Sequence, residues 1–422
     1  MRVLHTGDWH LGDRIGRRGI DRTEDLQRAV ERIMEIAEDN SVETMLIAGD
    51  LFSDKLHRQE DLADILDHLG RAVRPFLLNS GTILAVTGNH DKEQACHTLK
   101  STLALADPNE YLAGSLIRPG RLYLAMGPTF YRLADRKNQE VQFVMMPYPM
   151  PSRYLTGAGT GTRADLNAQL LAAYRTALLK ILADRERFRD DLSTVLVAHI
   201  YVGGAMIRQR FRLDESHDVN FRDGDIPAGF AYVALGHVHQ PQLIGKEEHI
   251  RYCGSIDRLD KGEKDDLKSV CIFDVGPKGR EGPVQVIPLE ATPFYDIDIT
   301  NPDTQVPRLT DDYPEHERAL VHYTLHWKAG VHNRDELLKK IERIFPNCYD
   351  RDVIDEGRHN EPTHHESLPG DTSDPRQVVL HFLEDTLTRK GDADRDEILA
   401  LARELLDEKP VGRGRKKAET SP

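Results

Sequence analysis

The sequence has few cysteines, no long apolar segment and no excess of positive charge. Its four cysteines stand apart without C-x-x-C spacing, which argues against a disulfide framework or a thiolate zinc site and favours a reducing cytoplasm. No apolar run approaches the ~20 residues that span a bilayer, and the first ten residues lack the apolar core of a signal peptide. Acidic residues outnumber basic ones, 70 to 56, which excludes a uniformly basic nucleic-acid coat protein but not a local basic groove.

The chain of 422 residues is long enough for two or three domains. Through its first part, short apolar runs alternate with amphipathic helical patterns. Arg2–Thr6, Thr44–Ala48 and Thr82–Thr87 are typical of buried strands, whereas residues 22–39 and 59–73 carry apolar side chains at helical spacing. This alternation of strands and helices predicts a layered core of the α/β class.

The rest of the chain is less regular. Residues 277–293 are rich in glycine, proline and charge, which indicates a boundary. Beyond it, a strand pattern at 319–327 and a helical pattern at 333–344 are typical of a small α+β domain. The sequence therefore predicts a first domain over 1–275, a second over 276–348 that residues 377–384 could extend, a polar loop over 349–376, a helical region over 385–410 and a disordered basic tail over 411–422.

Polar clusters follow five of the predicted strands, each at the point where the strand ends. They are Gly7-Asp8-Trp9-His10, Gly49-Asp50, Gly88-Asn89-His90-Asp91, His199 and Gly236-His237-Val238-His239. The strand ends of an α/β sheet open onto a crevice where ligands bind. One D-x-H pair is a weak signal, but five such clusters in order are hard to obtain by chance. We therefore expect these side chains to form one site.

The clusters supply nitrogen and oxygen donors and no thiolate. The candidate ligands are Asp8, His10, Asp50, Asn89, His199, His237 and His239. These donors exceed what one tetrahedral ion needs, whereas one carboxylate that bridges two cations would use them all. Mixed carboxylate and imidazole ligands suit manganese, iron or zinc better than calcium. Two such ions, about 3.5–4 Å apart, clamp a phosphoryl group and lower the pKa of a bound water. The sequence thus predicts metal-assisted phosphoester hydrolysis.

The D-x-H, G-D, G-N-H-D, H and G-H-x-H motifs, in this order, resemble those of the calcineurin-like metallophosphoesterase superfamily. GDLFSD and GNHD disfavour its phosphoprotein phosphatases, which carry G-D-x-V-D-R-G and G-N-H-E. HTGDWHLGD, VTGNHD, GHVHQPQ and RYCGS instead resemble the bacterial SbcD nuclease family, over residues 1 to about 275. The resemblance implies a two-sheet metallophosphoesterase sandwich flanked by helices, with a smaller α+β capping domain and a C-terminal helix.

The same resemblance implies roles for the site residues. One metal would be held by Asp8, His10, Asp50 and His239, and the second by Asp50, Asn89, His199 and His237, with Asp50 bridging the two. His90 would donate a proton to the leaving-group oxygen or stabilise its charge, and Asp91 would orient His90. Because the family prefers manganese, the expected cofactors are two divalent metal ions, Mn²⁺ above all.

SbcD proteins are exo- and endonucleases that work with an SbcC-type ABC ATPase bearing coiled-coil arms. The resemblance therefore implies double-strand exonuclease and single-strand or hairpin endonuclease activity on DNA in break repair and recombination. It also implies a homodimer and a cytoplasmic, nucleoid-associated protein with no membrane partner. A helix over 394–408 would dock the ATPase. Arg14, Arg17 and Arg18, just beyond the first metal motif, are the best candidates for phosphate contacts.

Two other interpretations stay open. A phosphodiesterase that acts on nucleotides or other small phosphodiesters would need all the same ligands, but it could end near residue 280, so the length beyond favours the nuclease. A DNA-end scaffold with a vestigial metal site would not need a complete ligand set. Since every candidate ligand is present, the scaffold is the least favoured of the three.

Overall fold

The computed structural model describes residues 1–56, 59–106, 109, 111–155, 161–206 and 218–357, and near the end of the chain residues 380, 383–384, 387 and 395–407. It forms two compact units, residues 1–357 and residues 358–422. The second unit contains α10 (Arg395–Asp407). Most of the predicted loop and of the possible strand over 377–384, and all of the predicted basic tail, lie outside the described residues. In the described part of the chain, no helix combines the length and apolar character needed to cross a membrane.

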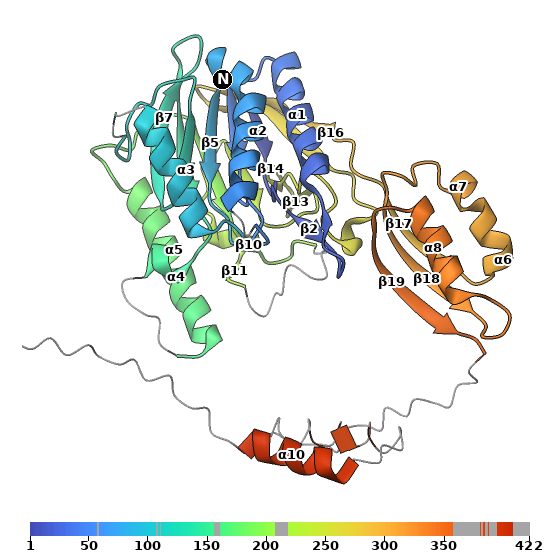
Figure 1. Ribbon diagram of the computed structural model, residues 1–422. Helices are drawn as coiled ribbons and strands as arrows, with labels where there is room; N and C mark the ends of the chain where they lie inside the picture. Colours follow the sequence, from blue (N-terminus) through green and yellow to red (C-terminus); the bar gives the residue numbers. More distant parts are fainter. Residues whose placement is uncertain are drawn as a thin grey trace, which may run out of the picture. The chain divides into compact units, whose positions relative to one another are not determined.

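Six strands form the first sheet, in the order β16-β15-β1-β4-β5-β6. Their bounds are β1 (Arg2–Thr6), β4 (Thr44–Ile47), β5 (Thr82–Val86), β6 (Leu122–Ala125), β15 (Ser269–Gly276) and β16 (Gly279–Pro288). The four strands from β1 to β6 run parallel, and β15 and β16 run antiparallel to their neighbours. The connections between the parallel strands are α1 (Thr23–Asp39), α2 (Gln59–Leu78) and α3 (Glu93–Ala106), which cover one face of the sheet (Figure 1).

Six more strands form the second sheet, in the order β13-β14-β12-β9-β8-β7. Their bounds are β7 (Thr129–Ala134), β8 (Glu140–Met146), β9 (Thr194–His199), β12 (Tyr232–Gly236), β13 (Gln242–Ile244) and β14 (Glu247–Tyr252). The central four run parallel. The helix α5 (Arg163–Leu182) begins at a capping box formed by Thr162 and Asp165 and packs Tyr174 and Leu178 against this sheet.

The two sheets pack face to face around a shared apolar core. Its members come from the inner faces of both sheets and include Val3, Leu46, Leu84, Phe143, Val197 and Ala234. Because helices cover the outer faces, the central strands are buried on both sides, and this explains their unbroken apolar runs. The structure confirms the α/β class that the strand and helix pattern predicts and the two-sheet sandwich flanked by helices that the resemblance implies.

A third, three-stranded sheet follows the sandwich along the chain. It consists of β17 (Phe294–Ile299), β18 (Leu320–Trp327) and β19 (Cys348–Asp355), and α8 (Arg334–Ile344) contributes to its separate apolar core. The shorter elements are β2 (Arg14–Ile15), β3 (Ile20–Asp21), α4 (Pro151–Tyr154), β10 (Tyr201–Val202), β11 (Asn220–Phe221), α6 (Pro302–Gln305) and α7 (Leu309–Asp312), with 3₁₀ turns at Asp223–Asp225, Lys261–Glu263 and Val306–Arg308.

Two segments differ from the sequence-based expectation. Gly279–Pro288 lies in the predicted boundary region but forms β16, whose glycine and proline content is tolerated because it is the edge strand of its sheet. The predicted loop from residue 349 begins with a strand, β19. Two of its acidic residues, Asp350 and Asp352, lie on the face of the third sheet that carries His322, and Asp352 pairs with His322 at 3.3 Å. A half-exposed edge strand therefore has the composition expected of a loop. The division of the chain into domains stays a prediction.

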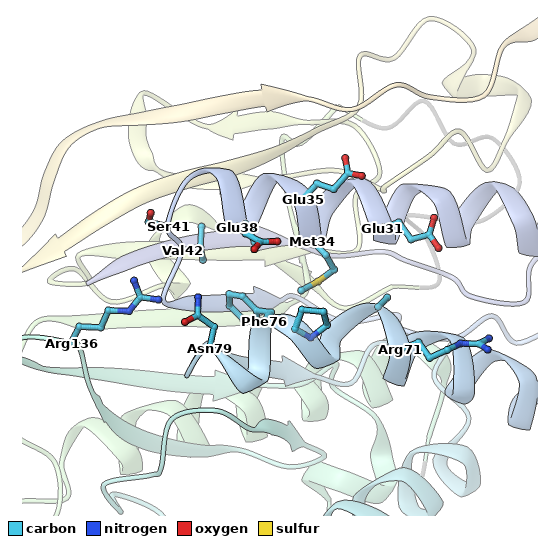
Figure 2. Close-up of a pocket in the computed structure, with 13 residues that line it drawn as sticks. Glu31, Met34, Glu35, Glu38, Ser41, Val42, Arg71, Phe76, Asn79 and Arg136 are labelled. Carbon is cyan, nitrogen blue, oxygen red and sulfur yellow. The ribbon is translucent and has the colours of Figure 1, made fainter.

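A groove of ≈ 400 Å³ lies between α1 and α2, toward the C-terminal ends of both helices (Figure 2). Met34 and Phe76 form apolar parts of its wall, and Glu31, Glu35 and Arg71 add charge. The thirteen described residues that line it include no candidate metal ligand. The groove is therefore separate from the predicted chemistry.

His5 in β1 is a core histidine, as the sequence predicts, and its burial makes folding stability depend on pH. Its ring is fully buried, with Nδ1 3.0 Å from the Tyr232 hydroxyl. Burial lowers the pKa of His5 from 6.5 to about 3. As the pH falls below 6.5, the unfolded chain binds a proton that the folded chain does not. The free energy of unfolding should therefore fall between pH 6.5 and about 3, by at most about 1.4 kcal/mol per pH unit.

We expect urea unfolding at pH 7 and pH 4.5 to reveal this contribution in a comparison with His5→Asn. The variant should lose less stability than the natural protein between the two pH values. The control is His97→Asn, because His97 is exposed on α3. An equal loss of stability in the natural protein and in His5→Asn would contradict the prediction.

Candidate metal centre

The candidate ligands lie at the C-terminal ends of parallel strands in both sheets. Asp8 and His10 follow β1, and Asp50 follows β4 in the first sheet; His199 ends β9, and His237 follows β12 in the second. Backbone hydrogen bonds join the first two loops, since Asp8 N donates to Gly49 O at 3.0 Å and His10 N donates to Asp50 O at 2.9 Å. The loops therefore form one rigid rim.

Four candidate ligands have a left-handed backbone conformation. Their φ angles are 51° for Asp8, 45° for His10, 51° for Asp50 and 100° for His237. Residues with a Cβ rarely adopt this region, at a cost of order 1–3 kcal/mol each, and do so where the surrounding structure imposes it. Backbone strain concentrated on predicted ligands supports a functional role for this rim.

Two glycines of the motifs make room for the site. A Cβ on Gly49, whose φ is 95°, would collide with the ring of His199. A Cβ on Gly88 would collide with the carboxylate of Asp50. The glycines of the G-D and G-N-H-D motifs are therefore required by close approach between loops of different strands.

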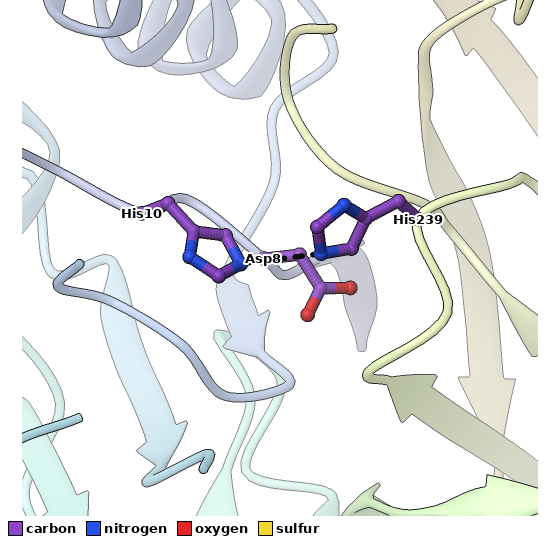
Figure 3. A group of neighbouring side chains, drawn as sticks. All are labelled: Asp8, His10 and His239. Atoms are coloured by element: carbon purple, nitrogen blue, oxygen red, sulfur yellow. Dashed lines mark hydrogen bonds between the residues drawn. The ribbon is translucent and has the colours of Figure 1, made fainter. Parts of the chain in front are cut away.

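The structure brings all the candidate ligands together. His10 Nε2 and His239 Nε2 lie 3.2 Å apart beside Asp8 (Figure 3). Asp50 Oδ2 lies 3.5 Å from His10 Nε2 and 3.3 Å from His199 Nε2. Two buried groups have ligand atoms close enough to hold one ion each, namely Asp8 with His10 and His239, and Asp8 with Asp50 and His199.

Asn89 joins the second group. Its Oδ1 lies 3.0 Å from His199 Nε2 and 2.9 Å from His237 Nδ1, and the two histidine nitrogens are 3.2 Å apart. Oxygen and nitrogen lone pairs thus converge from two sheets on two adjacent points. Asp50 touches both sets, and Asp8 is shared by both buried groups.

The outward-facing ring nitrogens of three histidines each have an acceptor. His199 Nδ1 lies 2.7 Å from Ala48 O, His237 Nε2 lies 2.8 Å from Asp218 Oδ2, and His239 Nδ1 lies 2.8 Å from Glu263 Oε1. A ring that donates its outer N–H keeps a lone pair on the inner nitrogen, and this arrangement is characteristic of metal-binding histidines. The donor set fits two divalent ions.

The electrostatics of the cluster also favour a cation. Burial alone would raise the pKa of the Asp50 carboxyl, but His199, His90 and His10 outweigh it and hold that pKa well below its usual range. Burial alone would lower the pKa of His199, yet Asp50 and Asp8 raise it to about 9. The site thus attracts positive charge, and a metal ion would replace the protons that bind without it.

His90 lies beside the cluster without joining the two buried groups. Its ring centroid is 4.9 Å from that of His10, its side chain is 18% exposed, and its backbone N–H donates to Asp50 Oδ1 at 2.8 Å. Its Nδ1 lies 3.5 Å from Asp54 Oδ1. The imidazole therefore lies at the edge of the cluster, partly open to solvent, and its role as proton donor stays a prediction.

Asp91 is expected to orient His90, but the hydrogen bonds of its carboxylate go to backbone N–H groups. Its fully buried carboxylate accepts hydrogen bonds from Gly88 N at 2.8 Å and Phe52 N at 2.9 Å. Burial raises its pKa to about 6, and the charge of Asp50 adds to that effect. Asp91 thus holds the β4 and β5 loops together, and any orienting effect on His90 acts through the loop backbone. Its predicted role stays a prediction.

The three arginines proposed to contact DNA lie on or beside the β2–β3 hairpin. Each pairs with an acid: Arg14 with Asp21 at 2.9 Å, Arg17 with Asp350 at 3.5 Å and Arg18 with Glu342 at 2.6 Å. The hairpin packs on the third sheet, where a Cβ on Gly16 would collide with the carbonyl of Tyr349. Arg17 and Arg18 therefore link the hairpin to β19 and α8, whereas Arg14 pairs within the hairpin, and DNA contact by all three stays a prediction.

Sequence reasoning missed the carboxylates that support His237 and His239. Glu263 is fully buried, 2.7 Å from Lys268 Nζ and 3.1 Å from Ser255 Oγ. Burial would raise its pKa, but Lys268 and His239 hold the pKa well below its usual range. The sequence around Glu263 is highly charged and resembles a solvated loop, so nothing in it indicates a buried carboxylate. The nearest sequence feature that could have pointed to this support is the RYCGS segment, whose Ser255 contacts Glu263. Asp218 had no signal.

Comparisons with known proteins identify relatives of this chain. A family model described as calcineurin-like phosphoesterase matches residues 1–241. The chain is similar to the curated SbcD component of the nuclease SbcCD from Escherichia coli K12, at 26% identity over 269 residues, which cover 60% of each protein. The protein of the same name from Bacillus subtilis is 27% identical over 310 residues, covering 69% of this chain and 70% of that protein.

A third relative of the same name, from Staphylococcus saprophyticus, is 21% identical over 385 residues, which cover 90% of this chain and 92% of that protein. The match to the E. coli relative spans only about 60% of that protein's length. Similarity is thus shared over different lengths of the chain with SbcD nucleases from several bacteria.

Proposed function

Because the chain belongs to the calcineurin-like phosphoesterase family, we propose that it is a metal-dependent DNA nuclease of the SbcD type. The observation that carries the proposal is the pair of buried donor groups at the shared strand ends. We infer double-strand exonuclease and single-strand or hairpin endonuclease activity, with two Mn²⁺ ions as cofactors. Work on chromosomal DNA would place the protein in the cytoplasm, at the nucleoid.

Each ion would be held by residues of both sheets. The first would be held by Asp8, His10, Asp50 and His239, and the second by Asp50, Asn89, His199 and His237. When bound, two such ions supply a water of lowered pKa and neutralise the charge of the phosphate oxygens. Asp50 fixes the β5 loop by accepting from His90 N, and the His90 ring is then placed to donate a proton to the departing oxygen.

The partner assignments rest on the names of the relatives, each of which is one component of a nuclease called SbcCD. We propose an SbcC-type ABC ATPase with coiled-coil arms as the partner and a homodimer of this chain as the working form. The helix α10 offers a docking element, since Ile398 and Leu401 are exposed on it. The two residues are three positions apart and so share one face of the helix, where apolar side chains that gather can form a partner-binding surface.

The proposal is tested by a cleavage assay on end-labelled double-stranded and hairpin DNA, with Mn²⁺, with Mg²⁺ and with a chelator. Mn²⁺-dependent cleavage that the chelator abolishes is the expected result. A small phosphodiester is included as an alternative substrate. Its hydrolysis without any DNA cleavage, alone or with the candidate ATPase and ATP, would contradict the nuclease proposal and favour a small-molecule phosphodiesterase.

A further inference from the structure

The two metal positions differ in how their histidines are oriented. His239 turns Nε2 toward the cluster because its Nδ1 faces Glu263, whereas His237 turns Nδ1 inward because its Nε2 faces Asp218. Glu263 orients His239, and Asp218 orients His237. These two histidines are predicted ligands of different metal ions. The carboxylate that orients a histidine at one metal position is therefore separate from the carboxylate that does so at the other.

Tyr148 extends the support of the second position. Its hydroxyl donates to Asp218 Oδ1 at 2.6 Å, while Asp218 Oδ2 lies 2.8 Å from His237 Nε2. The Tyr148 ring centroid also lies 5.4 Å from that of His237 and 5.9 Å from that of His199. One tyrosine thus contacts two candidate ligands directly or through Asp218.

Tyr148 and Asp218 are themselves held in place by other elements. Tyr148 N donates to Thr87 O at 2.9 Å, next to the loop that carries Asn89, a further predicted ligand of this position. Asn167 on α5 donates to Asp218 O at 2.9 Å. The phenol and the carboxylate are therefore fixed before a metal binds, and a fixed acceptor defines which nitrogen of His237 carries the proton.

We propose that Tyr148 is a positioning residue which, through Asp218, sets the metal affinity of the second position alone. The inference rests on the proposed function, since it assumes two metal positions. A charge-assisted hydrogen bond of this length is stronger than a neutral one. Without it, Asp218 Oδ1 keeps the longer hydrogen bond from Val219 N at 3.2 Å, which holds the carboxylate less firmly against His237. Changes to such supporting groups cost about 10–100-fold in metal affinity.

The test compares Tyr148→Phe with Tyr154→Phe by calorimetric titration with Mn²⁺ and by Mn²⁺ electron paramagnetic resonance. Tyr154 is a matched control in the same segment, because its hydroxyl donates to Pro147 O at 2.7 Å and its ring stacks on Tyr174 rather than on a ligand. Tyr148→Phe should weaken one of two Mn²⁺ sites about tenfold and reduce the spin-coupled signal. Tyr154→Phe should bind as the natural protein does.

A second pair of variants separates the positions. Asp218→Asn should weaken the same single site as Tyr148→Phe, and combining the two should add little further weakening. Glu263→Gln should weaken the other site, so combining it with Tyr148→Phe should weaken both. Thermal unfolding of the metal-free proteins shows whether a variant has lost its fold, and Tyr148→Phe should unfold as Tyr154→Phe does.

The outcomes distinguish this inference from the proposed function. If the natural protein binds two Mn²⁺ ions and Tyr148→Phe leaves both affinities unchanged, the inference is wrong and the nuclease proposal stands. If Tyr148→Phe weakens both sites equally, the supports are not separate and the inference is again wrong. If the natural protein binds fewer than two Mn²⁺ ions, the two-metal proposal itself fails and the inference fails with it.

Discussion

Replacing Asp50 with alanine is expected to remove metal from both positions and to lower DNA cleavage by at least about 10³-fold. The reason is the place of Asp50 Oδ2, 3.5 Å from His10 Nε2 and 3.3 Å from His199 Nε2, which are predicted ligands of different ions. A pair of divalent ions supplies several kcal/mol of transition-state stabilisation, and each 1.36 kcal/mol corresponds to about a tenfold change in rate.

The measurement is the Mn²⁺ content of the purified variant after dialysis, together with its cleavage rate. Asp67→Ala on α2 is the control, since that carboxylate is exposed and pairs with Arg71. Retention of one tightly bound ion by Asp50→Ala would show that Asp50 does not bridge. The bridging ligand would then be Asp8, which belongs to both buried donor groups.

His90→Ala should show the opposite pattern, with both metals retained and turnover lost. The His90 ring touches the cluster at His10 but is 18% exposed, so it is open to a substrate that approaches from solvent. A positioned general acid contributes about 10²–10⁴-fold to a rate. We therefore expect kcat to fall by that factor while KM and the Mn²⁺ content change little.

His97→Ala is the matched control, because His97 lies on α3, a few residues along the chain, and is exposed to solvent. Single-turnover cleavage under saturating protein separates the chemical step from product release. An unchanged cleavage rate in His90→Ala with full metal content would rule out proton donation by His90. Loss of metal together with activity would instead place His90 among the groups that build the site.

The meeting of the candidate ligands at one place could be predicted because their positions obey a simple rule of parallel sheets. Asp8, Asp50 and Asn89 follow consecutive parallel strands, so their side chains must meet at one edge of the first sheet. His199 and His237 follow neighbouring parallel strands of the second sheet in the same way. An apolar strand pattern followed by a glycine and a residue of a metal-binding type can be recognised within a few residues of sequence. Such short patterns are enough to predict which side chains meet at the sheet edge.

The supporting residues could not be predicted, because nothing local identifies them. Tyr148 and Asp218 are separated by 70 positions and meet only through the packing of α5 and the second sheet around them. Glu263 sits in a charged segment that reads as solvated, yet it is buried against Lys268. Arg17 and Arg18 lie close to the candidate ligands in sequence, but the β2–β3 hairpin carries them to acids of β19 and α8.

The most direct test of the dinuclear centre is an anomalous difference map from a crystal of this protein soaked in Mn²⁺. Two peaks about 3.5–4 Å apart are expected, one beside His10 and His239 and one beside Asn89 and His237, with Asp50 between them. A single peak, or two peaks with Asp50 beyond ligand distance of both, would contradict the shared centre on which the proposed nuclease depends.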